Sequence, residues 1–209
     1  MARDEESSVT MSLSASPGPS MSDPLVLLRQ RRSVPSRQLG GPAPDESTLQ
    51  ALLEAAIRVP DHGKLVPFRL IRLQGEAKLR LGEQLAALAV RHDLELSGAR
   101  QEKERLRYTF APLVLVVVAC LHADSAIPEI EQKLCAGNVA HNLLLGAHAL
   151  GFGAQWLTGW AAYDREAAAI LQLGDHEQVI GFIHLGTPLV EVPERDRPAL
   201  ADLLSSWTA

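Results

Sequence analysis

Two consecutive arginines and a serine, Arg31-Arg32-Ser33, are the first residues of this sequence that could bind an anion. A guanidinium group can donate two parallel hydrogen bonds to a phosphate, and a hydroxyl can donate another. A helix is predicted just ahead of them, because Asp23 can cap it and Pro24 suits its first position. The arginines would then leave the helix end, either to bind an anion or only to complement the free carbonyls of that helix.

A second candidate is the polar loop VPDHGKLVPF at residues 59–68, which holds two prolines and leads into a strand. Loops on a rigid scaffold often carry binding groups. Arg58 precedes the loop, and His62 and Lys64 lie in it, so three groups able to carry positive charge come together. The alternative is structural: Asp61 and His62 could form an Asx turn or a helix-capping pair.

A third candidate is the segment GFGAQWLTG at residues 151–159. Its glycines permit close approach of backbone, ahead of a strand that exposes Trp156 and Thr158. It is not the GxGxxG dinucleotide fingerprint, because it follows a helix and opens a strand. The alternative role of the glycines is to cap the preceding helix.

Several other kinds of site are excluded by the pattern. The sequence has no HExxH, GxSxG or Walker motif. Cys120 and Cys135 lack CxxC spacing and are predicted to be core thiols. His141 and His148 lie seven residues apart on one predicted helix, about 10.5 Å along its axis, which is too far to share a metal ion. We therefore predict no metal site and no catalytic side chain.

The elements that must position these candidates alternate between strands and helices. The pattern indicates an α+β fold with helices on both sides of a central mixed sheet. The helix at 127–150 is apolar around most of its circumference, which predicts burial in the core or in a subunit interface. Strands are predicted at residues 68–73, 113–119, 154–158 and 179–185, and further helices at 45–59, 76–107 and 164–173.

Composition limits the class of protein. Its 209 residues predict one domain over 23–209, preceded by a flexible Ser- and Pro-containing tail at 1–22. A net charge of -5 argues against a nucleic-acid binder. The longest apolar run, 111–121, is too short to cross a membrane. The first residues lack the basic and apolar parts of a signal peptide, which favours a cytoplasmic location.

Taken in their order, five parts of the sequence resemble the nitroreductase family, in particular its compact branch. They are the three candidate segments at 31–33, 59–68 and 151–159, the long helix at 127–150 and the closing VIGFIHLGTP at 179–188. The resemblance extends over nearly everything after residue 23. It implies a nitroreductase-like α+β fold and an intertwined homodimer. It also implies two FMN sites at the dimer interface, each built from both subunits.

The resemblance assigns roles to individual residues. Arg31, Arg32 and Ser33 match residues that hold the FMN phosphate and ribityl chain. Arg58 and His62 match residues that contact the same cofactor. Trp156, Leu157 and Thr158 match residues that approach its ring. The nicotinamide of NAD(P)H would be received at Gly146, Ala147, His148, Ala149, Leu150 and Gly151. Of the cations that could face the flavin N1 and C2 oxygen, Arg58 and His62 are favoured over Lys64 and Arg37.

The implied activity is ping-pong hydride transfer from NAD(P)H through FMN to a small, electron-poor acceptor such as a nitroaromatic or a quinone. Two alternatives remain: a protein that stores, senses or delivers FMN without efficient turnover, and a structural dimer without a cofactor. Lys64, Val66 and Phe68 depart from the common family pattern. Arg195 and Arg197 could replace the family's basic C-terminal extension, or belong to a solvated tail.

Overall fold

The computed structural model describes residues 24–93 and 95–208. Its centre is an antiparallel sheet in the order β2-β3-β5, with β4 and the short β1 also paired to β5. The α+β class is confirmed, but the expected mixed sheet is wrong, because every described strand pair is antiparallel. A continuous apolar strand reveals burial on both faces and does not reveal strand direction. The strands are β1 (Leu39–Gly40), β2 (Phe68–Gln74), β3 (Leu113–Cys120), β4 (Gly153–Leu157) and β5 (Glu177–Pro188).

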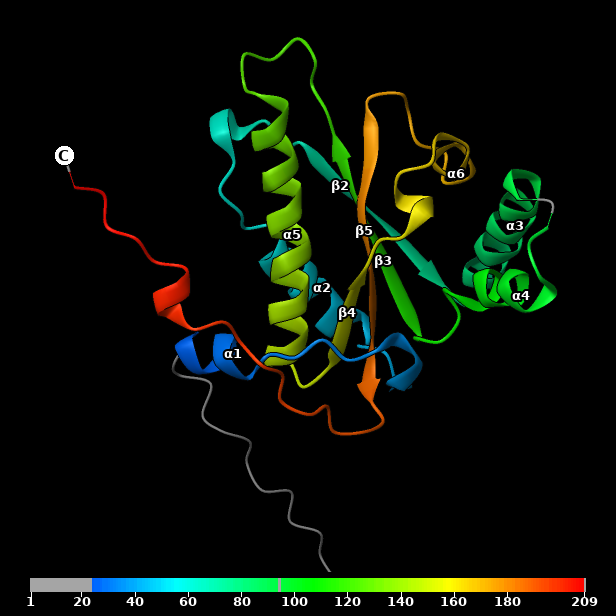
Figure 1. Cartoon of the computed structure of the whole chain (residues 1–209), viewed down its shortest axis with the longest axis horizontal. Helices are drawn as coiled ribbons and strands as arrows, with labels where there is room; N and C mark the ends of the chain where they lie inside the picture. Colours follow the sequence, from blue (N-terminus) through cyan, green and yellow to red (C-terminus); the bar gives the residue numbers. More distant parts are fainter. Residues whose placement is uncertain (1–23, 94, 209) are drawn as a thin grey trace, which may run out of the picture.

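Helices cover both faces of this sheet (Figure 1). Helices α2 (Glu46–Ala56) and α5 (Glu129–Ala149) pack on one face. The other face is covered by α3 (Glu76–His92) and α6 (Arg165–Ile170), and α4 (Gly98–Leu106) packs against α3. The single helical region expected over 76–107 is therefore two helices.

Strand β3 joins the two cores. Its residues Leu113, Leu115 and Val117 pack toward α2 and α5, and the alternate residues Val114 and Val116 pack toward α3. All five side chains are at most 1% exposed. Period-two alternation thus places one strand in two apolar layers at once, which explains its unbroken run of aliphatic residues.

The first described helix lies near the segment that follows the last strand. Helix α1 spans Pro24–Gln30, whereas the predicted cap Asp23 and the predicted tail at 1–22 lie outside the described residues. After β5, an arm of residues 189–208 runs past α1 and away from the body, with one short turn, η4 (Leu200–Asp202) (Figure 1). No helix in the described part of the chain is long and apolar enough to cross a membrane.

Helices α3 and α4 approach so closely at Gly82 that a β-carbon there would lie 2.0 Å from the backbone oxygen of Arg105. We expect Gly82→Ala to lower the free energy of unfolding by about 2 kcal/mol, because a backbone atom cannot move aside without shifting a helix. Chemical denaturation measures this change. Gly98→Ala is the control, since a β-carbon at that position would have nothing within 4 Å. Equal stability of the two variants would contradict the close approach.

Candidate functional site

The Arg31-Arg32-Ser33 segment lines a cavity of about 460 Å³ together with the start of the C-terminal arm. The arm contributes Arg195 and Arg197, more than 160 positions away in the sequence. Four arginines and two carboxylates, those of Glu194 and Asp196, therefore surround this cavity. The excess of two positive charges matches a phosphate dianion. We call this cavity the arginine pocket.

The two adjacent arginines have different roles. Arg32 donates to the carbonyl oxygens of Arg29 at 2.5 Å and Arg31 at 2.9 Å, and it also pairs with Glu194. It thus serves the helix end, as the structural alternative proposed. Among the described residues, the side chain of Arg31 makes only a long contact of 3.5 Å, to the hydroxyl of Ser33. Burial, Arg197 and Arg32 lower the pKa of Arg31, so its surroundings disfavour a further positive charge.

Backbone contacts hold the next residues against β4. The Val34 amide donates to the Ala154 carbonyl at 3.0 Å, and the Ser36 amide donates to the Gln155 side chain at 2.6 Å. Gly153 makes this possible, because a β-carbon there would lie 2.7 Å from Leu39 and 2.9 Å from Val34. The predicted close approach at this glycine is therefore present in the structure.

A second cavity, of about 240 Å³, lies at the other end of this segment and is lined by Ser36 and Arg37. Arg37 also lies over the ring of Phe110, 4.3 Å from its centroid. Arg107 is fixed by Glu104, with contacts of 2.6 and 2.9 Å that raise its pKa. We call this cavity the ring pocket; its remaining lining residues are Pro35, Lys103, Gln155 and Leu157.

The two pockets are adjacent along the chain, since residues 31–33 line one and 35–37 line the other. Both are rich in positive charge. A ligand with a phosphate at one end and a flat polar ring at the other matches this pair of cavities. Lys103 and Arg107 were not predicted from the sequence; the only local signal was the spacing of Glu104 and Arg107, which suits a helical ion pair.

A buried histidine lies beside the ring pocket. His184 on β5 pairs across the sheet with Gln155, and residues paired in this way share a face of the sheet. Its side chain is fully buried, and neither ring nitrogen has a partner among the described residues. The ring stacks on Tyr108, whose hydroxyl is also unpaired. Burial, Lys78 and Arg107 lower the pKa of His184 to about 4, so it is neutral at pH 7.

The alternation of β4 separates the predicted residues Trp156 and Leu157, and Thr158 follows the strand. Leu157 lines the ring pocket. Trp156 lies on the opposite face, against the α5 core, where its indole donates to the Ile180 carbonyl at 3.2 Å. The indole also fills the space above Gly181, which could not carry a side chain. Thr158 is half-buried.

The His62 loop lies at the opposite end of α5. His62 Nδ1 is 2.8 Å from Glu131 in the first turn of that helix. Asp61 accepts from the amides of Leu65 and Val66 at 3.1 and 2.9 Å, so its role in the protomer is to shape the loop. Lys64 and Val66 have left-handed backbone. Arg58 ends the preceding turn, where its carbonyl accepts from Asn142 on α5 at 3.3 Å.

Helix α5 separates this loop from the arginine pocket. His148, in its last turn, is close enough to Arg31 and Arg32 for both to lower its pKa, after the larger effect of burial. From Glu131 to His148 the helix rises about 25 Å. One protomer therefore does not bring His62 and Arg31 together.

Structural roles account for several of the residues predicted to receive nicotinamide. Gly146 allows α2 to approach α5, since a β-carbon would lie 2.5 Å from Leu52. Ala147 is fully buried. Gly151, with a φ of 81°, ends the helix as the capping alternative proposed. His148 and Ala149 are half-buried and Leu150 is exposed; a nucleotide contact at 146–151 stays a prediction.

The sequence is similar to a known protein family and to known bacterial proteins. The Nitroreductase family model matches residues 28–187. An Escherichia coli K12 protein named "Putative NAD(P)H nitroreductase YdjA" is 32% identical over 169 residues, covering 79% of this chain and 88% of the relative. A Haemophilus influenzae protein of the same general name is 34% identical over 175 residues, covering 83% and 92%.

Solved structures show the same fold. A nitroreductase-like family protein from Bacillus cereus superposes with a TM-score of 0.76 at 19% identity, covering 90% of this chain and 97% of that one. A Desulfovibrio desulfuricans structure determined in complex with FMN gives a TM-score of 0.68 at 23% identity, covering 89% and 98%.

His184 should make folding stability depend on pH. Its pKa is about 4 when folded and about 6.5 in an unfolded chain, so below pH 6.5 the unfolded chain binds a proton that the native state lacks. The contribution of His184 to the free energy of unfolding is fully present above pH 6.5 and is lost as the pH falls toward 4. Between pH 7 and pH 4.5, we expect the unsubstituted protein to lose about 2–3 kcal/mol more of its unfolding free energy than His184→Leu loses.

Chemical denaturation at the two pH values measures this difference. Tyr108→Phe is the matched control, since it removes the neighbouring unpaired hydroxyl without removing a group that titrates in this range. The buried neutral histidine would be refuted if His184→Leu and the unsubstituted protein lost the same stability on acidification.

Proposed function

Because the chain belongs to the nitroreductase family, we propose that it is an FMN-dependent oxidoreductase that uses NAD(P)H as its hydride donor. The observation that carries the proposal is the pair of cation-lined pockets spanned by residues 31–37. The acceptor would be a small, electron-poor molecule such as a nitroaromatic or a quinone. The cytoplasmic location and the single domain over 23–209 stay predictions from the sequence.

The residues present fit the cofactor. In the arginine pocket Arg31 is half-buried and has no ion-pair partner within the described ranges, and Arg195 and Arg197 line the same pocket from the arm. These three residues and Ser33 would hold the FMN phosphate. When bound, FMN would supply the redox chemistry of a ping-pong cycle, in which NAD(P)H is oxidised before the acceptor is reduced.

The ring pocket would orient the flavin and favour negative charge on its pyrimidine edge. Arg37 and Arg107 are held in place by Phe110 and Glu104, so these cations need little reorganisation when charge develops. They join Arg58 and His62 as candidates for this role. Leu157 would exclude water from one side of the ring, and the neighbouring Trp156 and Thr158 would contribute backbone only.

We further propose that the active form is a homodimer. Since α5 separates the His62 loop from the arginine pocket, the loop can reach an FMN site only in a second copy. Large apolar side chains are exposed near that loop, with Ile130 61% and Leu134 60% exposed. The arm carries a second group at 68–88% exposure, Leu200, Leu203, Leu204 and Trp207. Such surfaces are typical of subunit interfaces.

Anaerobic addition of NADPH or NADH to the purified, FMN-loaded protein should bleach its visible flavin absorbance, and an added quinone should restore it. Steady-state oxidation of the nucleotide with an acceptor distinguishes an oxidoreductase from a protein that only stores or delivers FMN. If neither nucleotide bleaches the flavin, the oxidoreductase proposal is wrong. If the purified protein refuses added FMN, the flavin proposal is wrong as well.

Arg31→Gln should weaken FMN binding by about 10–100-fold, because it removes a charge-assisted hydrogen bond to the phosphate. Titration of the apoprotein with FMN, followed by flavin fluorescence, measures the change. Arg29→Gln is the matched control: it removes the same charge two positions earlier, on α1 and outside the lining of the pocket. Equal weakening by both variants would mean that only overall charge matters.

A further inference from the structure

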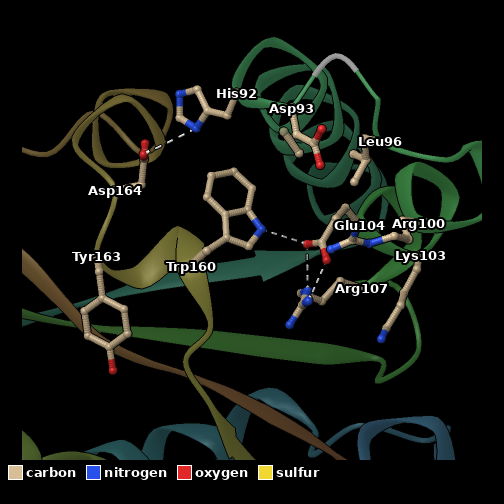
Figure 2. A pocket seen from close by; sticks show the side chains of 11 residues that line it. His92, Asp93, Leu96, Arg100, Lys103, Glu104, Arg107, Trp160, Tyr163 and Asp164 are labelled. Carbon is tan, nitrogen blue, oxygen red and sulfur yellow. Dashed lines mark hydrogen bonds and ion pairs between the residues drawn. The ribbon is translucent and has the colours of Figure 1, made fainter.

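A third cavity, of about 730 Å³, lies between α3, α4 and the turn that follows β4. Figure 2 shows the indole of Trp160 near the centre of this cavity, with His92 and Asp164 on one side and the basic side chains of α4 on the other. We call it the Trp160 cleft. Its volume suits a ligand the size of a nucleotide.

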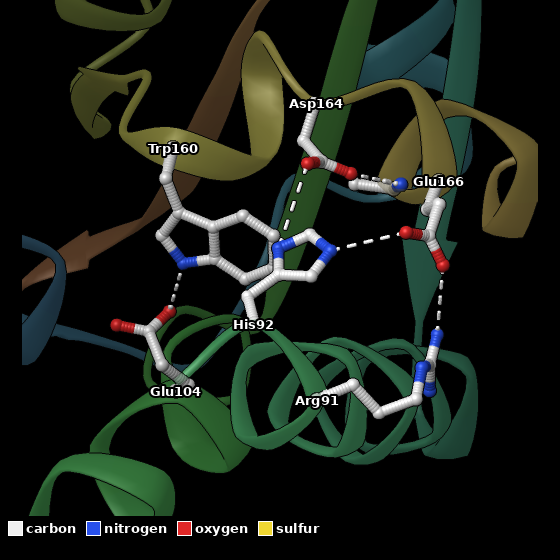
Figure 3. Close-up of polar contacts among 7 residues, drawn as sticks. Arg91, His92, Glu104, Trp160, Asp164 and Glu166 are labelled. Atoms are coloured by element: carbon white, nitrogen blue, oxygen red, sulfur yellow. Dashed lines mark hydrogen bonds and ion pairs between the residues drawn. The ribbon is translucent and has the colours of Figure 1, made fainter. Parts of the chain in front are cut away.

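The aromatic wall of the Trp160 cleft is held rigidly. The indole nitrogen of Trp160 donates to Glu104 at 3.2 Å, and the ring of His92 meets the indole edge-on, with centroids 6.1 Å apart. His92 is itself held between Glu166 at 3.1 Å and Asp164 at 3.7 Å (Figure 3). The indole is therefore a fixed flat surface on which a second ring can stack.

Two cations at the edge of the cleft have no ion-pair partner in the described part of the chain. Arg100 and Lys103 are both exposed on α4. By contrast, Arg105 and Arg107 each pair with the carboxylate three positions earlier. The two unpaired cations lie one helical turn apart on the same side of α4, a spacing that suits a single phosphate group held between them.

The carboxylates that line the cleft have partners other than Arg100 and Lys103. Glu104 is neutralised by Arg107, and Asp164 accepts from the Ala167 amide as the cap of α6. Asp93 accepts from the Glu95 amide. The α4 side of the cleft thus has a local excess of positive charge in a chain whose net charge is -5.

The cleft adjoins the ring pocket, because Lys103 and Arg107 line both cavities. A ligand that reacts in the ring pocket could extend past Arg107 and place a remote, anionic, aromatic group against Trp160. NADPH has this form: its nicotinamide reacts, and its adenosine carries a 2′-phosphate that NADH lacks. A small nitroaromatic or quinone has no such remote group.

We infer that the Trp160 cleft binds the 2′-phosphorylated adenosine end of NADPH, with adenine against Trp160 and the phosphate between Arg100 and Lys103. This inference rests on the proposed flavin-dependent function and deepens it by naming the donor. Recognition of the 2′-phosphate makes NADPH the preferred donor over NADH. Arg100 lines the cleft without lining the ring pocket, so substituting it leaves the lining of the ring pocket unchanged.

Calorimetric titration of the FMN-loaded protein with 2′-AMP and 5′-AMP tests the site without turnover. These probes carry the same charge and differ only in the position of the phosphate. We expect 2′-AMP to bind about tenfold more tightly, and Arg100→Gln to abolish the difference. Arg80→Gln removes a cation that lies on α3 and outside the cleft, so this control variant should keep the difference in affinity. Equal affinity for the two probes, or an unchanged difference in Arg100→Gln, overturns the inference.

Kinetics separates this inference from the function on which it rests. The ratio of kcat/KM for NADPH to that for NADH should fall about tenfold in Arg100→Gln and stay constant in Arg80→Gln. If both nucleotides reduce the flavin equally well in the unsubstituted protein, the proposed function stands and the NADPH site is wrong. If neither reduces it, the proposed function fails and the inference fails with it.

Discussion

Helix α5 is the constraint on which the proposed site depends. The sheet and α2 bury one side of it, so its position and its length are fixed by the core. Its last turn lies beside the arginine pocket, and its first turn holds His62 through Glu131. The two groups that family resemblance assigns to one cofactor are thus kept apart within a protomer. In the site that we propose, a second copy of the chain brings the two groups together.

Uneven charge is the second constraint on the site. The chain is acidic overall, yet cations gather without full compensation in the arginine pocket, the ring pocket and the Trp160 cleft. Arg31 is half-buried, so solvent screens its charge less than it screens the charges of the exposed cations around it. Arg32 and Arg107 are each paired with a carboxylate of the protein. Arg31 and Arg100, by contrast, have no ion-pair partner among the residues that the structure describes.

Much of the fold could be predicted from periodicity alone. The buried β3 and the long α5 were expected within two residues of their ends, because their apolar patterns are strong. Strand direction could not be predicted, since antiparallel and parallel strands buried on both faces look alike in sequence. The division of the charged region into α3 and α4 was also missed.

The candidate site was predictable only in part. Arg31 and Ser33 were identified from residue type, and their meeting with Arg195 and Arg197 depends on where the arm leaves β5. Lys103 and Arg107 had no signal of their own, because a charged helix usually faces solvent. Trp156 was expected to be exposed, but strand alternation places its indole against the α5 core, where it covers Gly181.

The most direct test of the central claim, a site completed by two copies, is complementation between two defective chains. Arg31→Gln and His62→Ala proteins would be unfolded together, refolded as a mixture and titrated with FMN. A mixed dimer has both substitutions in one site and neither in the other, so the mixture should bind FMN tightly although each variant alone binds it weakly. If mixing restores no tight binding, both residues act within one protomer, and a site shared between two copies is wrong.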